Sequence, residues 1–141
     1  MAASRDLKPN TAFLYVPTNL HINKHTIKAR APELWNVFEQ YPAVFFKHYD
    51  HQYLRIVTYV MMEMHKGAGS FWFPYFEVIS WSDLPMLWKP EEIDEFQDPV
   101  LIATIKAYRK DFDDEWRCVY DAIRNHDELF PGISSCAEKE D

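Results

Sequence analysis

The sequence predicts a mainly helical domain with a small N-terminal β element, an α+β arrangement in which helices dominate. Apolar residues recur at helical spacing in two segments, residues 52 to 65 and residues 99 to 123, whereas β-branched and aromatic residues concentrate in residues 11 to 22. The chain has 141 residues, the usual size of one domain, and such a domain buries roughly two-thirds of its unfolded surface. We therefore expect one hydrophobic core.

Composition and charge narrow the function classes. The chain is 48% hydrophobic with charges of both signs spread along it, which is typical of a globular protein rather than a disordered one. Its net charge of −7 and the lack of a long basic cluster argue against nucleic acid, whose binding depends on Lys and Arg. The acidic excess serves solubility or favours basic protein partners. We expect a protein substrate or partner and no nucleic acid.

The cysteines and the N-terminus indicate the compartment. Cys118 lies in an apolar helical context that predicts a core position, and Cys136 lies on a polar tail. The first ten residues lack the apolar run of a signal peptide, so we expect an intracellular, reducing location in cytoplasm or nucleus. The run "IVTYVMMEMH" is too short to cross a bilayer. No membrane association is expected.

The N-terminal part predicts strands followed by a short helix. Residues 11 to 22 are interrupted by Pro17, which favours two short strands or one bent strand. Pro32 is suited to the first turn of a helix, and Pro42 stops that helix. The expected apolar side of this helix consists of Leu34, Trp35, Val37 and Phe38.

The segment from Gln52 to His65 predicts a largely buried helix. Residues at helical spacing form one apolar face: Tyr53, Ile56, Val57, Val60, Met61 and Met64. Further apolar residues occupy other faces: Leu54, Tyr59 and Met62. A helix that is apolar on several sides is expected to be enclosed by its neighbours.

The strongest periodic pattern predicts a long amphipathic helix after Asp98. Asp98 is a suitable N-cap, and Pro99 suits the first helical position. The apolar side consists of Leu101, Ile105, Tyr108, Phe112, Trp116, Val119 and Ile123. Charges of both signs occupy the other face, a pattern typical of a solvated surface: Lys106, Arg109, Lys110, Asp113, Asp114, Arg117, Asp121 and Arg124.

The stretch "GAGSFWFPYF", residues 67 to 76, predicts a corner between two helices. Gly67 or Gly69 is expected to end the preceding helix with left-handed backbone. Ser70 is expected to cap a short helix with Pro74 in its first turn. The aromatic residues Phe71, Trp72, Tyr75 and Phe76 would then fold into the core. A dinucleotide-binding loop would need a third glycine and a preceding strand.

An alternative function for this corner is partner binding. Trp72 and Tyr75 combine flat apolar faces with a polar group, which suits a groove for a partner peptide. Trp81 and Trp88 are further possible contacts. The sequence thus offers Trp72 and Tyr75 as candidate residues of a substrate or partner groove.

No catalytic or metal-binding constellation is predicted. His48 and His51 flank Asp50, but a zinc site needs three or four ligands, and no cysteine pair or acidic helix motif completes this one. The strand-to-helix nucleophile motif GxSxG does not occur. We therefore assign no catalytic, cofactor-binding or metal-binding residue.

The order of several motifs resembles one family. "SRDLKPNTAFLYVP" and then "TNLHI" are followed by a helix ending at Glu63, the break "KGAG" and a Ser-x-Trp-x-Pro-Tyr motif. This order is similar to the Rubisco methyltransferase and actin-histidine methyltransferase branch of the SET superfamily. The motif residues are Ser70, Trp72, Pro74 and Tyr75. The resemblance covers residues 2 to 130.

The resemblance implies part of a protein methyltransferase that uses S-adenosylmethionine. Residues 1–25 correspond to the early SET strands, residues 26–130 to the inserted helical subdomain that forms one wall of the substrate cleft, and residues 131–141 to a disordered tail. The target would be a protein lysine or histidine. The family's glycine-rich cofactor loop, Asn-His motif and channel tyrosine have no counterpart here. We therefore expect this chain alone to be inactive and to bind no S-adenosylmethionine.

Three interpretations follow for the whole chain. In the first, the chain is a methyltransferase fragment, either encoded by a split gene or truncated. In the second, it is a stable, non-catalytic helical protein-interaction module. In the third, it is an unrelated helical domain in which the motif is coincidental. The last would lack the paired short strands before the helices.

Overall fold

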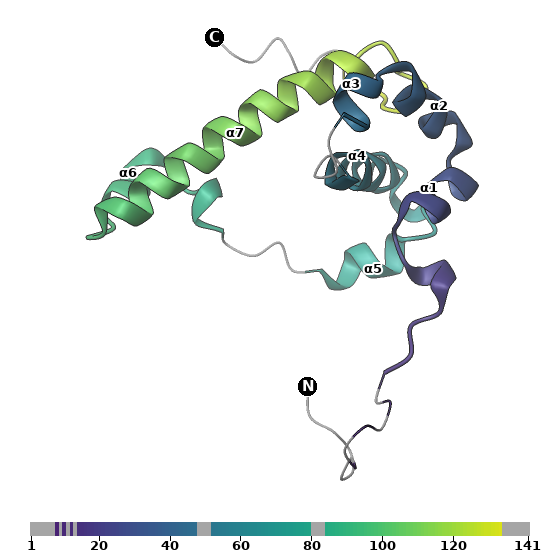
Figure 1. Ribbon diagram of the computed structural model, residues 1–141, viewed down its shortest axis with the longest axis horizontal. Coiled ribbons are helices and arrows are strands. Elements are labelled where there is room, and N and C mark those ends of the chain that lie inside the picture. The colour runs from purple at the N-terminus through teal and green to yellow at the C-terminus, as the bar shows by residue number, and fades with distance from the viewer. Residues whose placement is uncertain are drawn as a thin grey trace.

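Helices make up most of the chain, as the sequence predicts (Figure 1). A computed structural model describes residues 8, 10, 12, 14–47, 52–79 and 84–133. Over these residues the α-helices are α1 (Lys24–Arg30), α2 (Pro32–Gln40), α3 (Pro42–Phe45), α4 (Gln52–His65), α5 (Phe73–Val78), α6 (Pro90–Asp94) and α7 (Pro99–Ile123). Three short 3-10 helices join them: η1 (Thr18–Leu20), η3 (Gly67–Gly69) and η4 (Pro85–Leu87).

The expected N-terminal β element is not seen in the described part of this region. Residues 14–17 are without regular structure, and η1 follows, closed by a bond from the Leu20 N–H to the Pro17 carbonyl at 2.9 Å. A strand forms only where another strand satisfies its backbone groups. None of the described residues is in a strand. Residues 11 and 13 lie outside the described residues.

Helix α1 is an element that the sequence analysis missed. Asn23 caps it by accepting from the backbone N–H groups of His25 and Thr26, and the Thr26 hydroxyl accepts from the Asn23 N–H at 2.9 Å. This reciprocal pair is a capping box, which the Asn-x-x-Thr spacing could have revealed. The helix begins at Lys24 and so crosses the expected boundary at residue 25.

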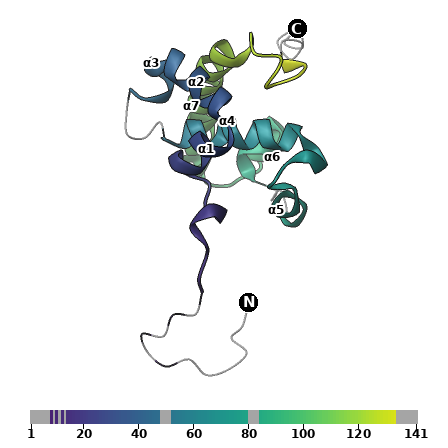
Figure 2. The same cartoon turned by 90° about the vertical axis from the view of Figure 1, so that its right-hand side faces the viewer.

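The core gathers where α1, α2 and α4 meet the C-terminal end of α7 (Figure 2). All four residues predicted for the apolar side of α2 are buried: Leu34, Trp35, Val37 and Phe38. Phe45 of α3 lies 4.5 Å from Phe38 between ring centroids. The core continues past α7 to Phe130 and Ile133.

Helix α4 has the predicted bounds but not the predicted burial. Its buried residues are Leu54, Arg55, Thr58, Tyr59, Met62 and Glu63. Tyr53, Val57 and Met64 of the predicted apolar face are exposed instead. The buried polar groups are satisfied, since Thr58 donates to the Leu54 carbonyl at 2.7 Å and Arg55 donates to the Phe45 carbonyl. Burial lowers the pKa of Arg55.

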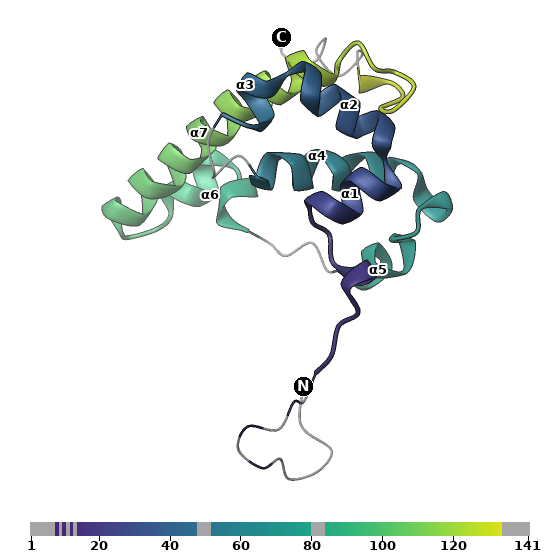
Figure 3. The ribbon, with the colours of Figure 1, turned by 45° about the vertical axis from the view of Figure 1, so that its right-hand side comes forward.

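The predicted helix after Asp98 and its cap are confirmed in α7. The Asp98 carboxylate accepts from the N–H groups of Val100 and Leu101 at 2.9 and 3.1 Å, and Pro99 occupies the first turn. The helix runs from α6 at one end to α2 and α3 at the other (Figure 3). Cys118, expected in the core, is exposed because it points away from the apolar side.

The apolar side of α7 is buried only in part. Val119 and Ile123 join the main core, and Ile105 is buried near the α6 end, while Tyr108 and Phe112 between them are exposed. Arg109, predicted to be on a solvated face, instead ties η4 to the helix by donating to the carbonyls of Met86 and Trp88. The middle of α7 therefore presents uncovered apolar side chains.

Replacing the cap of α7 is expected to weaken the fold. Asp98→Ala removes the acceptor for two helix N–H groups and should lower the free energy of unfolding by about 1 kcal/mol, measured by urea denaturation. Asp98→Asn keeps an acceptor and should lose much less. Equal losses in both variants would show that the cap contributes no stability.

Candidate functional site

An apolar groove lies between α4 and α5. Its volume is about 650 Å³, within the size range of ligand sites. We call it the aromatic groove, and its lining residues are Leu20, Ile22, Ile56, Val60, Phe71, Trp72, Pro74, Tyr75, Phe76 and Ile79. The two candidate residues, Trp72 and Tyr75, thus line one groove.

The corner that forms one side of this groove begins at Gly67. Its φ of +52° is the left-handed conformation predicted for the end of α4. Gly69 does not share that conformation; its N–H bonds to the Lys66 carbonyl at 3.0 Å within η3. The Ser70 N–H bonds to the Gly67 carbonyl at 3.0 Å. The chain thereby reverses from α4 toward α5 in a few residues.

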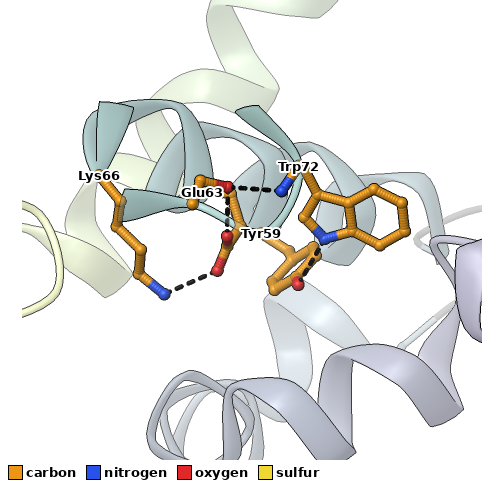
Figure 4. A network of polar contacts seen from close by, with 5 residues as sticks. Tyr59, Glu63, Lys66 and Trp72 are labelled. Atoms are coloured by element: carbon orange, nitrogen blue, oxygen red, sulfur yellow. Dashed lines mark hydrogen bonds and ion pairs between the residues drawn. The ribbon is translucent and has the colours of Figure 1, made fainter. Parts of the chain in front are cut away.

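A buried polar network fastens this corner to α4 (Figure 4). The Glu63 carboxylate accepts from Lys66 Nζ at 2.6 Å with one oxygen and from the Ser70 hydroxyl at 2.6 Å with the other. Ser70 Oγ accepts in turn from the Trp72 backbone N–H at 3.0 Å. The Trp72 indole N–H donates to the Tyr59 hydroxyl at 2.8 Å. Both N–H groups of Trp72 are therefore bonded to atoms positioned by α4.

Helix α1 also contacts the corner through one cation. The Arg30 guanidinium carbon lies 3.6 Å from the Phe71 ring centroid and 5.8 Å from that of Trp72. The rings of Phe71 and Trp72 meet edge to face at 89°, with centroids 5.1 Å apart. Cation–π and edge-to-face contacts favour fixed ring orientations. Phe71 and Trp72 are therefore held both by the network with α4 and by Arg30 of α1.

The aromatic residues of the corner are only partly buried. Trp72 is 6% exposed, but Phe71 and Tyr75 are 49% and 51% exposed, contrary to their predicted place in the core. For Tyr75 the reason is that α5 has only six residues, fewer than two turns, and buries none of them. Ser70 does not cap α5 as predicted but is the C-cap residue of η3; Trp72 is the N-cap residue of α5, while Pro74 lies in its first turn as predicted.

The other residues that the sequence analysis singled out are not among the described lining of the aromatic groove. Trp88 stacks on Phe96 with 5.4 Å between centroids and is not among the described lining of the groove. Trp81, Cys136 and the histidine pair His48 and His51 lie outside the described residues. Over the part of the chain that is described, no group of three or more His, Cys, Asp or Glu side chains is placed to hold a metal ion.

The chemistry available in the groove is apolar contact. Its described lining includes no charged side chain, and its main polar groups belong to Trp72 and Tyr75. Burial raises the pKa of Tyr59 beneath Trp72, so this phenol stays protonated as an acceptor at neutral pH. The groove is suited to apolar or aromatic side chains that need little polar recognition.

Comparison of the chain with protein-family models, curated proteins and solved structures gives no match. Among the described residues, no helix has the length and apolar character needed to cross a membrane.

The Glu63–Ser70 bond is expected to contribute measurable stability. Glu63→Ala and Ser70→Ala each leave a buried polar partner unsatisfied and should cost about 1–3 kcal/mol of unfolding free energy. The double variant should lose less unfolding free energy than the two single variants together, because the second substitution removes a side chain that has already lost its hydrogen-bond partner. Glu77→Ala on exposed α5 should stay within about 0.5 kcal/mol. Strict additivity in urea denaturation would mean that the two side chains are not coupled.

Tyr59→Phe is expected to destabilise the protein and to change its alkaline behaviour. The variant leaves the Trp72 indole N–H without an acceptor, at about 1–3 kcal/mol. Burial raises the pKa of Tyr59 in the folded protein, so the folded state keeps the phenol proton to higher pH than the unfolded chain does. The stability that the protonated phenol contributes is complete below about pH 10 and is lost at higher pH. Unfolding measured from pH 8 to 11 should therefore show a shallower alkaline decline in Tyr59→Phe. Tyr108→Phe on exposed α7 should retain the native slope, and an unchanged slope in Tyr59→Phe would contradict the assignment.

Proposed function

We propose that this chain is a protein-interaction module that binds an apolar segment of a partner protein in the aromatic groove. The observation that carries the proposal is the combination of an open apolar groove with a fixed aromatic base. Trp72 forms that base, and the half-exposed Phe71 and Tyr75 stand beside it.

The fixed base favours binding because little freedom is lost on association. Trp72 is held by its two N–H bonds and by the cation of Arg30, so it is already oriented before a partner arrives. Tyr and Trp are the residue types that most often dominate the energy of protein interfaces. Tyr75 keeps enough exposure to close over an inserted side chain.

A second candidate function follows from the resemblance to SET-type methyltransferases. The resemblance is carried by the N-terminal segments "SRDLKPNTAFLYVP" and "TNLHI" together with Glu63, Ser70, Trp72, Pro74 and Tyr75, of which Glu63, Ser70 and Trp72 form the network. The described residues before the helices contain no paired strands, so this candidate depends on the sequence motifs alone. Under this proposal the chain is part of a protein-lysine or protein-histidine methyltransferase, its groove contributing to the wall that receives the substrate protein. Under both candidate functions we propose an intracellular location, in cytoplasm or nucleus.

The aromatic groove does not fit the family's cofactor. S-adenosylmethionine carries a carboxylate, an amine and a sulfonium, and the described lining offers no charged side chain to bind them. No step of methyl transfer is therefore assigned to the groove. Its task under either candidate is to bind protein.

Peptide selection tests the groove directly. Peptides selected from a displayed random library against the purified chain should contain aromatic or large aliphatic residues and bind with measurable heat. Tyr75→Ala should weaken their binding about tenfold or more, the effect of losing an aromatic anchor. Tyr108→Ala on α7 is the matched control and should bind normally. Selected peptides indifferent to Tyr75→Ala would overturn the proposal.

Titration with S-adenosylmethionine tests the expectation that this chain alone binds no cofactor. Micromolar binding, together with methylated product from a protein substrate, would contradict that expectation and favour the methyltransferase function. A result without either agrees with both candidates, because a partial methyltransferase domain is also expected to be inactive alone.

A further inference from the structure

A second apolar groove lies on the other side of α4, against α7. Its volume is about 310 Å³. We call it the α4–α7 groove, and its lining residues are Tyr53, Leu54, Val57, Thr58, Met61, Phe112, Glu115, Trp116 and Val119. It shares no described lining residue with the aromatic groove, which uses Ile56 and Val60 of α4. The two grooves are therefore separate surfaces on the two flanks of one helix.

Exposed aromatic side chains continue from this groove along α7. Phe112 is 54% exposed and Tyr108 is 63% exposed, whereas Ile105, one turn before Tyr108 on the same side, is buried. From Tyr108 to Trp116 this apolar stripe is about 12 Å long at 1.5 Å per residue. An occupant that covers it must be elongated and apolar along one side, which describes an amphipathic helix seated in a groove.

Carboxylates flank the stripe. Glu115 lines the groove, Asp111 lies one turn before it on the same edge, and Asp113 lies on the opposite edge by helical spacing. None of the three is in an ion pair with a described residue, whereas Asp114 and Asp121 pair with arginines on the outer face.

The nearby cations are already engaged or lie elsewhere. Arg109 is bound to the carbonyls of Met86 and Trp88, and Lys106 pairs with Asp94 at 2.9 Å. Lys110 lies on the outer face by helical spacing. The edges next to Phe112 are therefore acidic, which favours an occupant with positive charge on its flanks.

We propose that the α4–α7 groove binds an amphipathic helix whose apolar side is bordered by Lys or Arg. A second copy of this chain is a poor occupant, because its own stripe would bring Asp111 and Asp113 against the same carboxylates. The chain's last eight residues are also a poor occupant, since they contain three carboxylates and one lysine. The net charge of −7 adds long-range attraction for a basic partner.

A pair of synthetic peptides tests charge and shape together. One 16-residue helical peptide has Leu at helical spacing with Lys on both edges; its control has Glu in place of Lys. The Lys peptide should bind the full chain by fluorescence anisotropy and weaken steeply with salt, and the Glu peptide should not bind. Equal binding of the two peptides would overturn the proposal.

Charge-matched variants locate the site. Asp111→Asn with Glu115→Gln should weaken the Lys peptide about fivefold, the sum of two surface ion pairs. Asp114→Asn with Asp121→Asn removes the same charge from the outer face and should change binding much less. Equal weakening by both pairs would show attraction to net charge alone, which contradicts a defined site.

The aromatic contact provides the last check. Phe112→Ser changes an exposed residue, so the helical circular dichroism signal should persist while binding falls about tenfold or more. Tyr75→Ala, which tests the aromatic groove, should leave binding of the Lys peptide unchanged. A failure of one proposal can therefore be distinguished from a failure of the other. Sedimentation that shows a dimer dissociated by Phe112→Ser but not by the peptide would identify a second copy as the occupant and overturn this inference.

Discussion

The buried carboxylate of Glu63 is the contact on which the candidate site depends. A carboxylate is costly to bury unless every oxygen is bonded, and here Lys66 binds one oxygen and Ser70 the other. Ser70 can reach Glu63 only if the chain turns sharply after α4, which Gly67 permits with its positive φ. Trp72 is then brought over Tyr59. One satisfied charge thus determines the path of the corner and the position of the groove's base.

The same helix that buries polar groups exposes apolar ones. Arg55, Thr58 and Glu63 are satisfied within the fold, while Tyr53 and Val57 face outward. Exposed apolar side chains gathered in grooves mark interaction surfaces more often than scattered ones do. Tyr53 and Val57 line the α4–α7 groove, whereas the partly buried Ile56 and Val60 line the aromatic groove. The two grooves differ in charge, since only the α4–α7 groove has a charged residue in its described lining.

The candidate site was partly predictable. The glycine corner and the association of Trp72 with Tyr75 could be inferred from residues close in sequence, and the network explains why Glu63, Ser70 and Trp72 occur at this spacing. The exposure of Phe71 and Tyr75 could not be inferred, because it depends on how far the short helix α5 lies from the core. The second groove was missed for a similar reason: apolar periodicity identified the apolar side of α7 but not which parts of that side are covered.

The sequence by itself determined the helices whose ends are encoded locally. Asp98 and Pro99 start α7, Pro32 starts α2, and Gly67 ends α4, since capping and backbone preferences act within a few residues. Only the tertiary structure decided which face of α4 is buried and whether residues 14–17 find a strand partner. Those outcomes depend on contacts between segments distant in sequence, and a face with Arg55 and Glu63 becomes the inner one only when Phe45 and Ser70 are in place to bond them.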